Sequence, residues 1–571
     1  MCNPSLSDNS LTISTTKPIT SIPIPAKPPH NNIYLDLLSL KNNIPENEIM
    51  QKNNEGYEPI SNNNNNNPLS ILSNPSISDV VRETGSLFSL AIPILLTNLI
   101  LYSRSMLSMV FLGRIGDVEL AAGSLAIAFA NITGYSVFSG LALGMEPLCA
   151  QAFGAQRYKL LSLTLQRCVI FLLLCSLPIS FLWFHMSSIL GYLHQDPKIA
   201  KLAHTFILFS FPDLLTNSFY HPIKVYLRAQ GITRPVTVAS LAGAVLHVPI
   251  MVFLVGPLQL GIVGVAVATS ASNLVSLAVL VTQVWLGGLH VKTWNPPNRE
   301  CLTGWEPLVR LAAPSCVSVC LEWWWYEIMI VLCGLLVDPR ATVASMGVLI
   351  QTTGLIYNFP ASLSNAVSTR VGNELGAGRA QRAKLSGIVG IMWASIMGLV
   401  AMFFAFGARH VWARMFTHDS EILALTAAAL PILGLCELGN CPQTVACGVV
   451  RGTARPATAA NVNLGAFYGV GMPVAVGLAF YLGIGFCGLW IGLLSAQICC
   501  AGLLLYVVGT TDWAHQAKRA QLLAHSGGPN YLSTETSSVD TSLLLHDEKD
   551  DKISQNDDEK ETLICILVSS S

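Results

Sequence analysis

The sequence predicts an all-α polytopic membrane protein with twelve transmembrane helices in two six-helix lobes related by a parallel internal repeat. Composition is the first observation: 52% of the 571 residues are hydrophobic and 11% are charged, against about 25% charged in a soluble domain. The second is a series of apolar segments near the ~20 residues needed to cross a bilayer. The third is a set of motifs that recur at a nearly constant spacing.

Apolar segments start at twelve places between about residues 86 and 510. Several are longer than a bilayer requires, so we expect tilted or kinked helices. They begin near Leu87, Leu120, Leu160, Ile199, Pro235, Leu260, Leu308, Val343, Leu385, Ile422, Pro456 and Cys487.

Three pairs of motifs define the repeat, at offsets of about 221, 222 and 223 residues. Six spans per half is an even number, so both halves enter the membrane in the same orientation. Two equivalent lobes around a central cavity are typical of an alternating-access transporter. The pairs are LAIPILL at Leu90 with LAAPSCV at Leu311, AQAFGAQR at Ala150 with GNELGAGR at Gly372, and YLRAQG at Tyr226 with VVRGTA at Val449.

The repeat also sets the expected domain boundaries. An N-lobe covers residues 85–290, a cytoplasmic inter-lobe loop covers 291–306, and a C-lobe covers 307–513. Residues 1–84 are rich in Asn and Ser, and residues 514–571 end in acidic runs. Such compositions bury too little apolar surface to fold, so we expect two disordered cytoplasmic tails.

The distribution of Lys and Arg predicts the orientation. Sixteen of these residues lie near the span ends on one side and six on the other, which places both termini in the cytoplasm. The start of the chain lacks the pattern of a cleavable signal peptide, so the first span would serve as the insertion signal. In the second tail, Asp540, Leu544 and Leu545 match an acidic dileucine pattern that sorting adaptors could bind. The sequence leaves the plasma membrane and an endosomal or vacuolar membrane both open.

Several function classes find no support. The net charge of −1 gives no indication of nucleic-acid binding. The fifteen cysteines lie mostly within spans and form no paired C-x-x-C pattern, so we expect no metal site and no cofactor. No span contains H-E-x-x-H or G-x-S-x-G, so we expect no enzyme and no catalytic residue.

Four acidic residues lie within the expected spans: Asp213, Glu322, Glu327 and Glu437. A carboxylate at the bilayer centre costs roughly 2.5–3.5 kcal/mol on insertion scales, so such residues usually have a function. The repeat relates Asp213 to Glu437, whereas Glu322 and Glu327 have neutral counterparts in the first half. The acids are therefore concentrated in the second lobe.

Glu322 and Glu327 flank a cluster of aromatic residues. A carboxyl group in a cavity of low dielectric constant can exchange protons and can pair with a cationic solute. Trp323, Trp324 and Tyr326 would supply apolar surface and cation–π faces. Glu327 lies roughly 140° around the helix from Glu322, so we expect only one of them to face the cavity centre. Alternatively, the acids pair with neighbouring groups and stabilise a kink.

Three further charges are interpreted as structural. Arg104 and Lys224 are expected to be helix-end or partner charges rather than ligands. Glu146, at the inner end of the second span, is expected to cap a helix or to form an ion pair near a cytoplasmic gate.

Five stretches together resemble the multidrug and toxic compound extrusion (MATE) family, and most closely its plant DETOXIFICATION branch. The resemblance covers roughly residues 86–513 and implies two bundles that exchange organic solutes for protons. In eukaryotic relatives, two glutamates of the LEWW element and an acid in the tenth helix serve coupling and substrate binding; they correspond to Glu322, Glu327 and Glu437. The aspartate of the prokaryotic first helix has no counterpart in Leu87–Leu112. The stretches are LAIPILLTNLILYSRSMLSMVFLGRIGDVELAAGSLA, GMEPLCAQAFGAQR, CLEWWWYE, STRVGNELGAG and GVVRGTARP.

The leading hypothesis is a monomeric, proton-coupled antiporter that exports xenobiotics, secondary metabolites or hormone-like compounds. Its partners would be the organic solute, protons and the lipid bilayer. One alternative is a lipid-linked flippase of the same superfamily, although a phosphate-bearing headgroup favours a cationic cavity and the expected cavity is acidic and aromatic. The other is a membrane signalling component without transport.

Overall fold

The computed structural model describes residues 76–192 and 195–526, and all the regular structure within them is helical. Residues 1–75 and 527–571 lie outside the described part, and with them most of the two predicted tails. The sorting pattern at Asp540, Leu544 and Leu545 also lies outside it.

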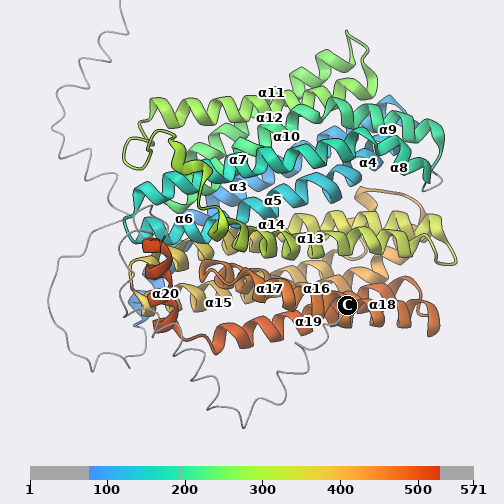
Figure 1. Cartoon of the computed structure of the whole chain (residues 1–571). Coiled ribbons are helices and arrows are strands. Elements are labelled where there is room, and N and C mark those ends of the chain that lie inside the picture. Colours follow the sequence, from blue (N-terminus) through green and yellow to red (C-terminus); the bar gives the residue numbers. More distant parts are fainter. Residues whose placement is uncertain (1–75, 193–194, 527–571) are drawn as a thin grey trace, which may run out of the picture. The chain divides into compact units, whose positions relative to one another are not determined.

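The first half of the described chain consists of α-helices of 7 to 39 residues and one π-helical segment. Figure 1 shows how the α-helices are arranged. In order these are α3 (Ile77–Ile115), α4 (Asp117–Ala130), the π-helical η2 (Asn131–Tyr135), α5 (Ser136–Leu143), α6 (Met145–Gly154), α7 (Tyr158–Phe184), α8 (Met186–Tyr192), α9 (Pro197–Phe209), α10 (Phe211–Ala229), α11 (Arg234–Val255) and α12 (Gly261–Leu286).

The second half follows a short 3₁₀ helix, η3 (Arg299–Leu302), in the inter-lobe loop. Its elements are α13 (Glu306–Cys333), α14 (Pro339–Gly376), α15 (Ala380–Ala408), η4 (Trp412–Met415), α16 (Ser420–Gly452), α17 (Pro456–Asn463), the π-helical η5 (Leu464–Gly471), α18 (Met472–Val476), the π-helical η6 (Gly477–Tyr481), α19 (Phe486–Gly509) and α20 (Trp513–Ser526).

The described helices account for the twelve predicted spans. Ten continuous helical segments are long and apolar enough to cross a membrane. An eleventh span is the pair α9 and α10, which meet at a bend of 45°. The twelfth is α14, which has 38 residues but a more polar sequence. The prediction of an all-α, twelve-helix membrane protein is therefore confirmed.

Aspartate caps begin three helices at the end of the bundle remote from α6. The side chains of Asp196, Asp338 and Asp419 each accept a backbone N–H from the first turn of α9, α14 and α16. A proline follows the cap in α9 and α14, where a missing N–H has no cost. These caps explain why the helices begin where they do.

Both predicted tail boundaries differ from the structure. Composition extends the first tail to residue 84, but α3 begins at Ile77, and Glu83 is buried against Arg370 of α14 at 2.8 Å. Composition starts the second tail at residue 514, but α20 continues to Ser526. Residues at helical spacing bury one face of α20, including Trp513, Ala517 and Ala520. A short amphipathic helix has too few apolar residues to be recognised from composition.

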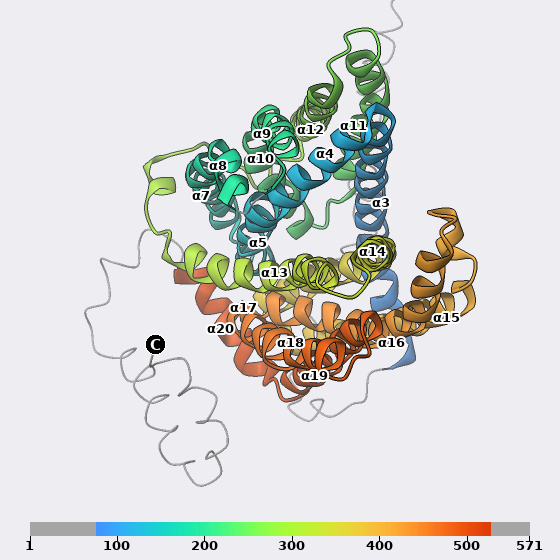
Figure 2. The same cartoon turned by 90° about the vertical axis from the view of Figure 1, so that its right-hand side faces the viewer.

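Two clusters of buried hydrophobic side chains form the cores of the lobes, and each takes residues from the other half of the sequence. Figure 2 shows the two groups of helices, with α13 between them. Leu87, Leu90 and Ala91 of α3 belong to the C-lobe cluster. Leu308, Leu311 and Ala312 of α13 belong to the N-lobe cluster. The first helix of each lobe therefore starts in the core of the opposite lobe, and we call this arrangement the helix exchange.

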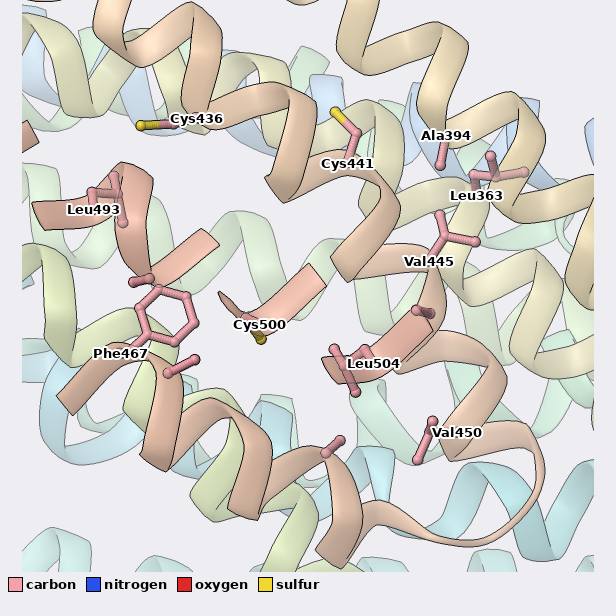
Figure 3. Packing of buried hydrophobic residues seen from close by; sticks show 14 of the residues in the cluster. Leu363, Ala394, Cys436, Cys441, Val445, Val450, Phe467, Leu493, Cys500 and Leu504 are labelled. Carbon is pink, nitrogen blue, oxygen red and sulfur yellow. The ribbon is translucent and has the colours of Figure 1, made fainter. Parts of the chain in front are cut away.

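Figure 3 shows part of the C-lobe cluster from close by. Leu363 of α14, Ala394 of α15 and Val445 of α16 lie together in it, and all three are almost or fully excluded from solvent. Close packing of this kind holds the three helices as one unit.

The two copies of one repeated motif, at the ends of α6 and α14, pack against each other. The amide of Gln151 donates to the carbonyl oxygen of Gly452 at 3.0 Å, and the amide of Asn373 donates to that of Ala229 at 3.2 Å. Donors and acceptors correspond to each other in the repeat, at offsets of 222 and 223 residues. We call this region the motif contact. Its reciprocal bonds are those expected of a pseudo-twofold axis between the lobes.

Candidate functional site

A cavity of about 560 Å³ lies between the two lobes. Helices α3, α5 and α10 of the N-lobe and α13, α14 and α16 of the C-lobe contribute its walls. We call it the central cavity. An adjacent N-lobe cavity of about 300 Å³ lies among α3, α4, α10 and α12. The volume of the central cavity lies within the ~300–1,000 Å³ typical of small-molecule sites, and that of the N-lobe cavity lies at the lower end of this range.

Glu322 and Glu327 of α13 both line the central cavity. Both border the cavity, and that only one of them faces its centre stays a prediction. Arg451 and Glu437 are the charged groups that act electrostatically on Glu322. Neither glutamate has an ion-pair partner among the residues that the structure describes.

The aromatic residues of α13 divide between the cavity and the core. Trp323, Trp324 and Tyr326 line the central cavity, and the indole N–H of Trp324 donates to the carbonyl oxygen of Ile132 at 3.3 Å. Trp325 is fully buried instead, in an edge-to-face contact with Phe467, with ring centroids 5.6 Å apart. All three predicted aromatic residues thus lie at the cavity.

Glu437 of α16 lies behind the cavity wall rather than on it. Its carboxylate accepts hydrogen bonds from Thr353 Oγ1 at 2.6 Å and from Asn440 Nδ2 at 2.9 Å. Thr353 itself lines the central cavity together with Tyr326. One hydroxyl group therefore connects Glu437 to the cavity.

Asp213 of α10 is separated from the three glutamates. It is buried at the N-lobe cavity, where the Tyr135 hydroxyl donates to Oδ2 at 2.8 Å and Asn273 donates to Oδ1. Arg104 in turn donates to Asn273 and acts electrostatically on Asp213. This contact agrees with the expectation that Arg104 is a partner charge.

Glu146 of α6 joins the two lobes. Its buried carboxylate lies 3.0 Å from a guanidinium nitrogen of Arg228 in the N-lobe and 2.9 Å from one of Arg451 in the C-lobe. Arg228 and Arg451 are equivalent in the repeat, at an offset of 223 residues, so two symmetry-related cations share one anion. A helix cap or an ion pair is expected here from the sequence, and the structure shows an ion pair with two arginines.

Two cavity residues were missed by the sequence analysis. His221 and Lys224 of α10 line both cavities, although Lys224 is expected to be a partner charge. The signal was available: Asp213, Asn217, His221, Lys224 and Arg228 are spaced by three or four residues, which places them on one face of a helix. The central cavity is therefore lined by charges of both signs, and not only by acidic and aromatic groups.

The described residues contain no group of three or more His, Cys, Asp or Glu side chains placed to hold a metal ion.

Comparison with known proteins identifies the family. The MatE family model matches the chain twice, over residues 93–253 and 314–477. This chain belongs to the MatE family. The two matches begin 221 residues apart and fall one in each lobe, as the repeat predicts. The chain is thus an integral multi-pass membrane protein of a family of transporters that move small organic solutes.

Plant relatives match most of the chain. Protein DETOXIFICATION 51 of Arabidopsis thaliana is 69% identical over 449 residues, which are 79% of this chain and 84% of that protein. Protein DETOXIFICATION 52 of the same organism is 63% identical over 462 residues, 81% of this chain and 91% of that protein. The crystal structure of the eukaryotic MATE transporter AtDTX14 has a TM-score of 0.75 and 30% identity, and covers 78% of this chain and 100% of that one. The predicted resemblance to the MATE family is confirmed.

Proposed function

We propose that this MatE transporter is a proton-coupled antiporter that exports organic solutes by alternating access between its lobes. One observation carries the proposal: Glu322 and Glu327 line an inter-lobe cavity beside Trp324 and Tyr326. A carboxylate that lines a cavity and has no ion-pair partner can hold either a proton or a cationic group. Glu437, behind Thr353, would take part in the exchange, and Asp213 would not be required for it.

The available energy suffices for such an exchange. A gradient of one pH unit supplies about 1.4 kcal/mol per proton, which corresponds to about a tenfold concentration ratio at one-to-one stoichiometry. Exchange of one proton for one monovalent cation moves no net charge, so the membrane potential would not affect it. A neutral residue at position 322 could bind solute but could not exchange a proton for it.

Flux in proteoliposomes with an imposed pH gradient tests the proposal. We expect Glu322→Gln to remain folded and to bind solute, but to lose the dependence of transport on the gradient. Glu322→Asp should retain part of the activity with a shifted pH profile. Glu421→Gln is the matched control, because Glu421 is exposed at the start of α16. Gradient-driven accumulation by Glu322→Gln equal to that of the wild type would refute the mechanism.

A lipid-linked flippase is the second candidate. The cations Lys224, Arg228 and Arg451 on the central cavity favour it, because a phosphate headgroup needs positive charge. Headgroup exposure in the same proteoliposomes, without solute flux, would support this candidate. Absence of both activities would favour the signalling component.

The remaining assignments belong to the same proposal. We infer that the protein is a monomer. Both termini would lie in the cytoplasm, since the Lys and Arg residues concentrate at the α6 end of the bundle. Its membrane would be the plasma membrane or an endosomal or vacuolar membrane. Sorting adaptors at Asp540, Leu544 and Leu545 would favour the latter two.

A further inference from the structure

Lys224 lies where three cavities meet. It lines the central cavity, the N-lobe cavity and a third cavity of about 30 Å³ near the start of α11. His221, one turn earlier on α10, lines the first two. The Lys224 side chain therefore borders the space that a solute in the central cavity would occupy.

The acidic groups on the N-lobe side are occupied by other partners. Glu146 binds Arg228 and Arg451, and Asp213 accepts hydrogen bonds from Tyr135 and Asn273. Within residues 76–192 and 195–526, Lys224 has no ion-pair partner, and its electrostatic neighbours are Arg228 and Glu146. A lysine that is removed from water without a counter-ion is costly, so a bound anionic group would stabilise it.

The C-lobe wall of the same cavity contributes two acidic side chains. Glu322 and Glu327 lie on α13, and Trp323 lines both the central and the N-lobe cavity. The two arginines that also line the cavity, Arg228 and Arg451, both pair with Glu146, which leaves Glu322 and Glu327 on one lobe and Lys224 on the other without an ion-pair partner among the described residues, with an aromatic ring that both cavities share. An aromatic solute that carries both charges can satisfy both walls at once.

We propose that the substrate is an organic zwitterion whose carboxylate binds Lys224 while its cationic group lies at Glu322 and Glu327. The inference rests on the proposed function only in assuming that solutes bind in the central cavity. A lysine ammonium forms a charge-assisted hydrogen bond with a carboxylate, and the imidazole of His221 adds a donor. The two ends of the solute would bridge the lobes through the cavity.

The proposal has an electrical consequence. A zwitterion carries no net charge, so its exchange for a proton moves one positive charge across the membrane. Exchange of the corresponding cation moves none. The two kinds of solute therefore differ in how the membrane potential affects their transport.

Two dyes that differ in one group provide the test. Tetramethylrhodamine has a carboxylate and a delocalised cation, and its methyl ester retains only the cation. We would measure the affinity of both for the purified full-length protein by fluorescence anisotropy. The variants are Lys224→Gln, Lys224→Arg and the control Lys384→Gln, since Lys384 is exposed on α15.

The wild type and Lys384→Gln should bind the zwitterion about 10- to 100-fold more tightly than the ester, the range of one charged hydrogen bond. Lys224→Gln should lose this preference and still bind the ester, which shows that it is folded. Lys224→Arg should keep most of the preference. In liposomes, only flux of the zwitterion should respond to an imposed potential.

Three outcomes would overturn the proposal. They are a wild type that prefers the ester, an unchanged preference in Lys224→Gln, and a folded wild type that binds neither dye. The binding assay uses no pH gradient, so it is independent of proton coupling. If Glu322→Gln proved fully coupled while the preference persisted, the proposed coupling would fail and the substrate class would stand.

Discussion

Trp324 and Trp325 are neighbours in the sequence but have opposite surroundings. Trp324 lines the central cavity, whereas Trp325 is buried against Phe467 in the C-lobe core. We expect Trp325→Ala to lower the free energy of unfolding by about 3–5 kcal/mol, because it leaves a void in a packed core. Trp324→Ala should leave stability nearly unchanged. Thermal unfolding of both variants in the same detergent measures the difference.

Solute affinity provides the complementary measurement. Trp324→Ala should weaken binding of a cationic solute by about 0.5–2 kcal/mol, the range of a cation–π contact. Proton coupling should persist, because Glu322 is unchanged. If Trp324→Ala unfolded as readily as Trp325→Ala, the assignment of the two faces would be wrong.

Glu437 and Asp213 are equivalent in the repeat but not in their contacts. Glu437 has neutral hydrogen-bond partners, whereas Asp213 lies in a network that contains the cation Arg104. We expect Glu437→Gln to abolish gradient-driven transport and Asp213→Asn to leave a measurable rate. Initial rates in proteoliposomes, at matched amounts of protein, decide this. Equal loss in both variants would instead indicate two symmetric coupling sites.

At the level of elements, α6 and α14 approach each other so closely that only glycine fits between them. A β-carbon on Gly376 would overlap the backbone of Gln151, and one on Gly154 would overlap that of Asn373. These positions are equivalent in the repeat, so the motif contact depends on both glycines. This contact joins the two lobes at the α6 end of the bundle.

We therefore expect Gly376→Ala to force α6 and α14 apart and to lower the transport rate at least tenfold. Gly347→Ala on the same helix is the control, because nothing lies within 4 Å of its added β-carbon. Alanine in a helix interior is more favourable than glycine, so the control should be as stable as the wild type or more stable. Equal transport rates for the two variants would show that the α6 end does not need this contact.

At the scale of the whole molecule, one carboxylate and two arginines link the two lobes at the same end. Loss of Glu146 would leave Arg228 and Arg451 without a shared anion, at a cost of about 3–5 kcal/mol. We expect Glu146→Gln to open the α6 end, which hydrogen exchange of α6 and α14 would detect as reduced protection.

The repeat offers a rescue experiment. The position equivalent to Glu146 is Ser368, which is fully buried and whose hydroxyl has no hydrogen-bond partner among the described residues. The double variant Glu146→Ser with Ser368→Glu should restore protection, because the acid returns to the same two arginines from the other lobe. A double variant as open as Glu146→Gln would mean that the pseudo-twofold axis does not extend to these side chains.

Features of the fold that depend on hydropathy and residue spacing could be predicted from the sequence. The spans, the repeat and the acids Glu322 and Glu437 follow from one-dimensional patterns. Features that depend on the three-dimensional surroundings of a side chain could not be predicted. Lys224 has the sequence context of a lysine at a helix end, and only the structure shows that it lines the cavities. The start of α3 and the extent of α20 were missed for a related reason, since a few buried residues and one ion pair hold these segments without altering their composition.

The helix exchange suggests how such a chain could arise. Neither half of the sequence completes its own core, because Leu90 packs in the C-lobe and its repeat partner Leu311 packs in the N-lobe. A gene encoding only one half would have given a product that was stable only as a domain-swapped homodimer, each copy lending its first helix to the other. Duplication and fusion would then convert an association that depended on concentration into an intramolecular one. Consistent with this history, the two halves produced as separate chains should be unstable alone and stable when they are made together.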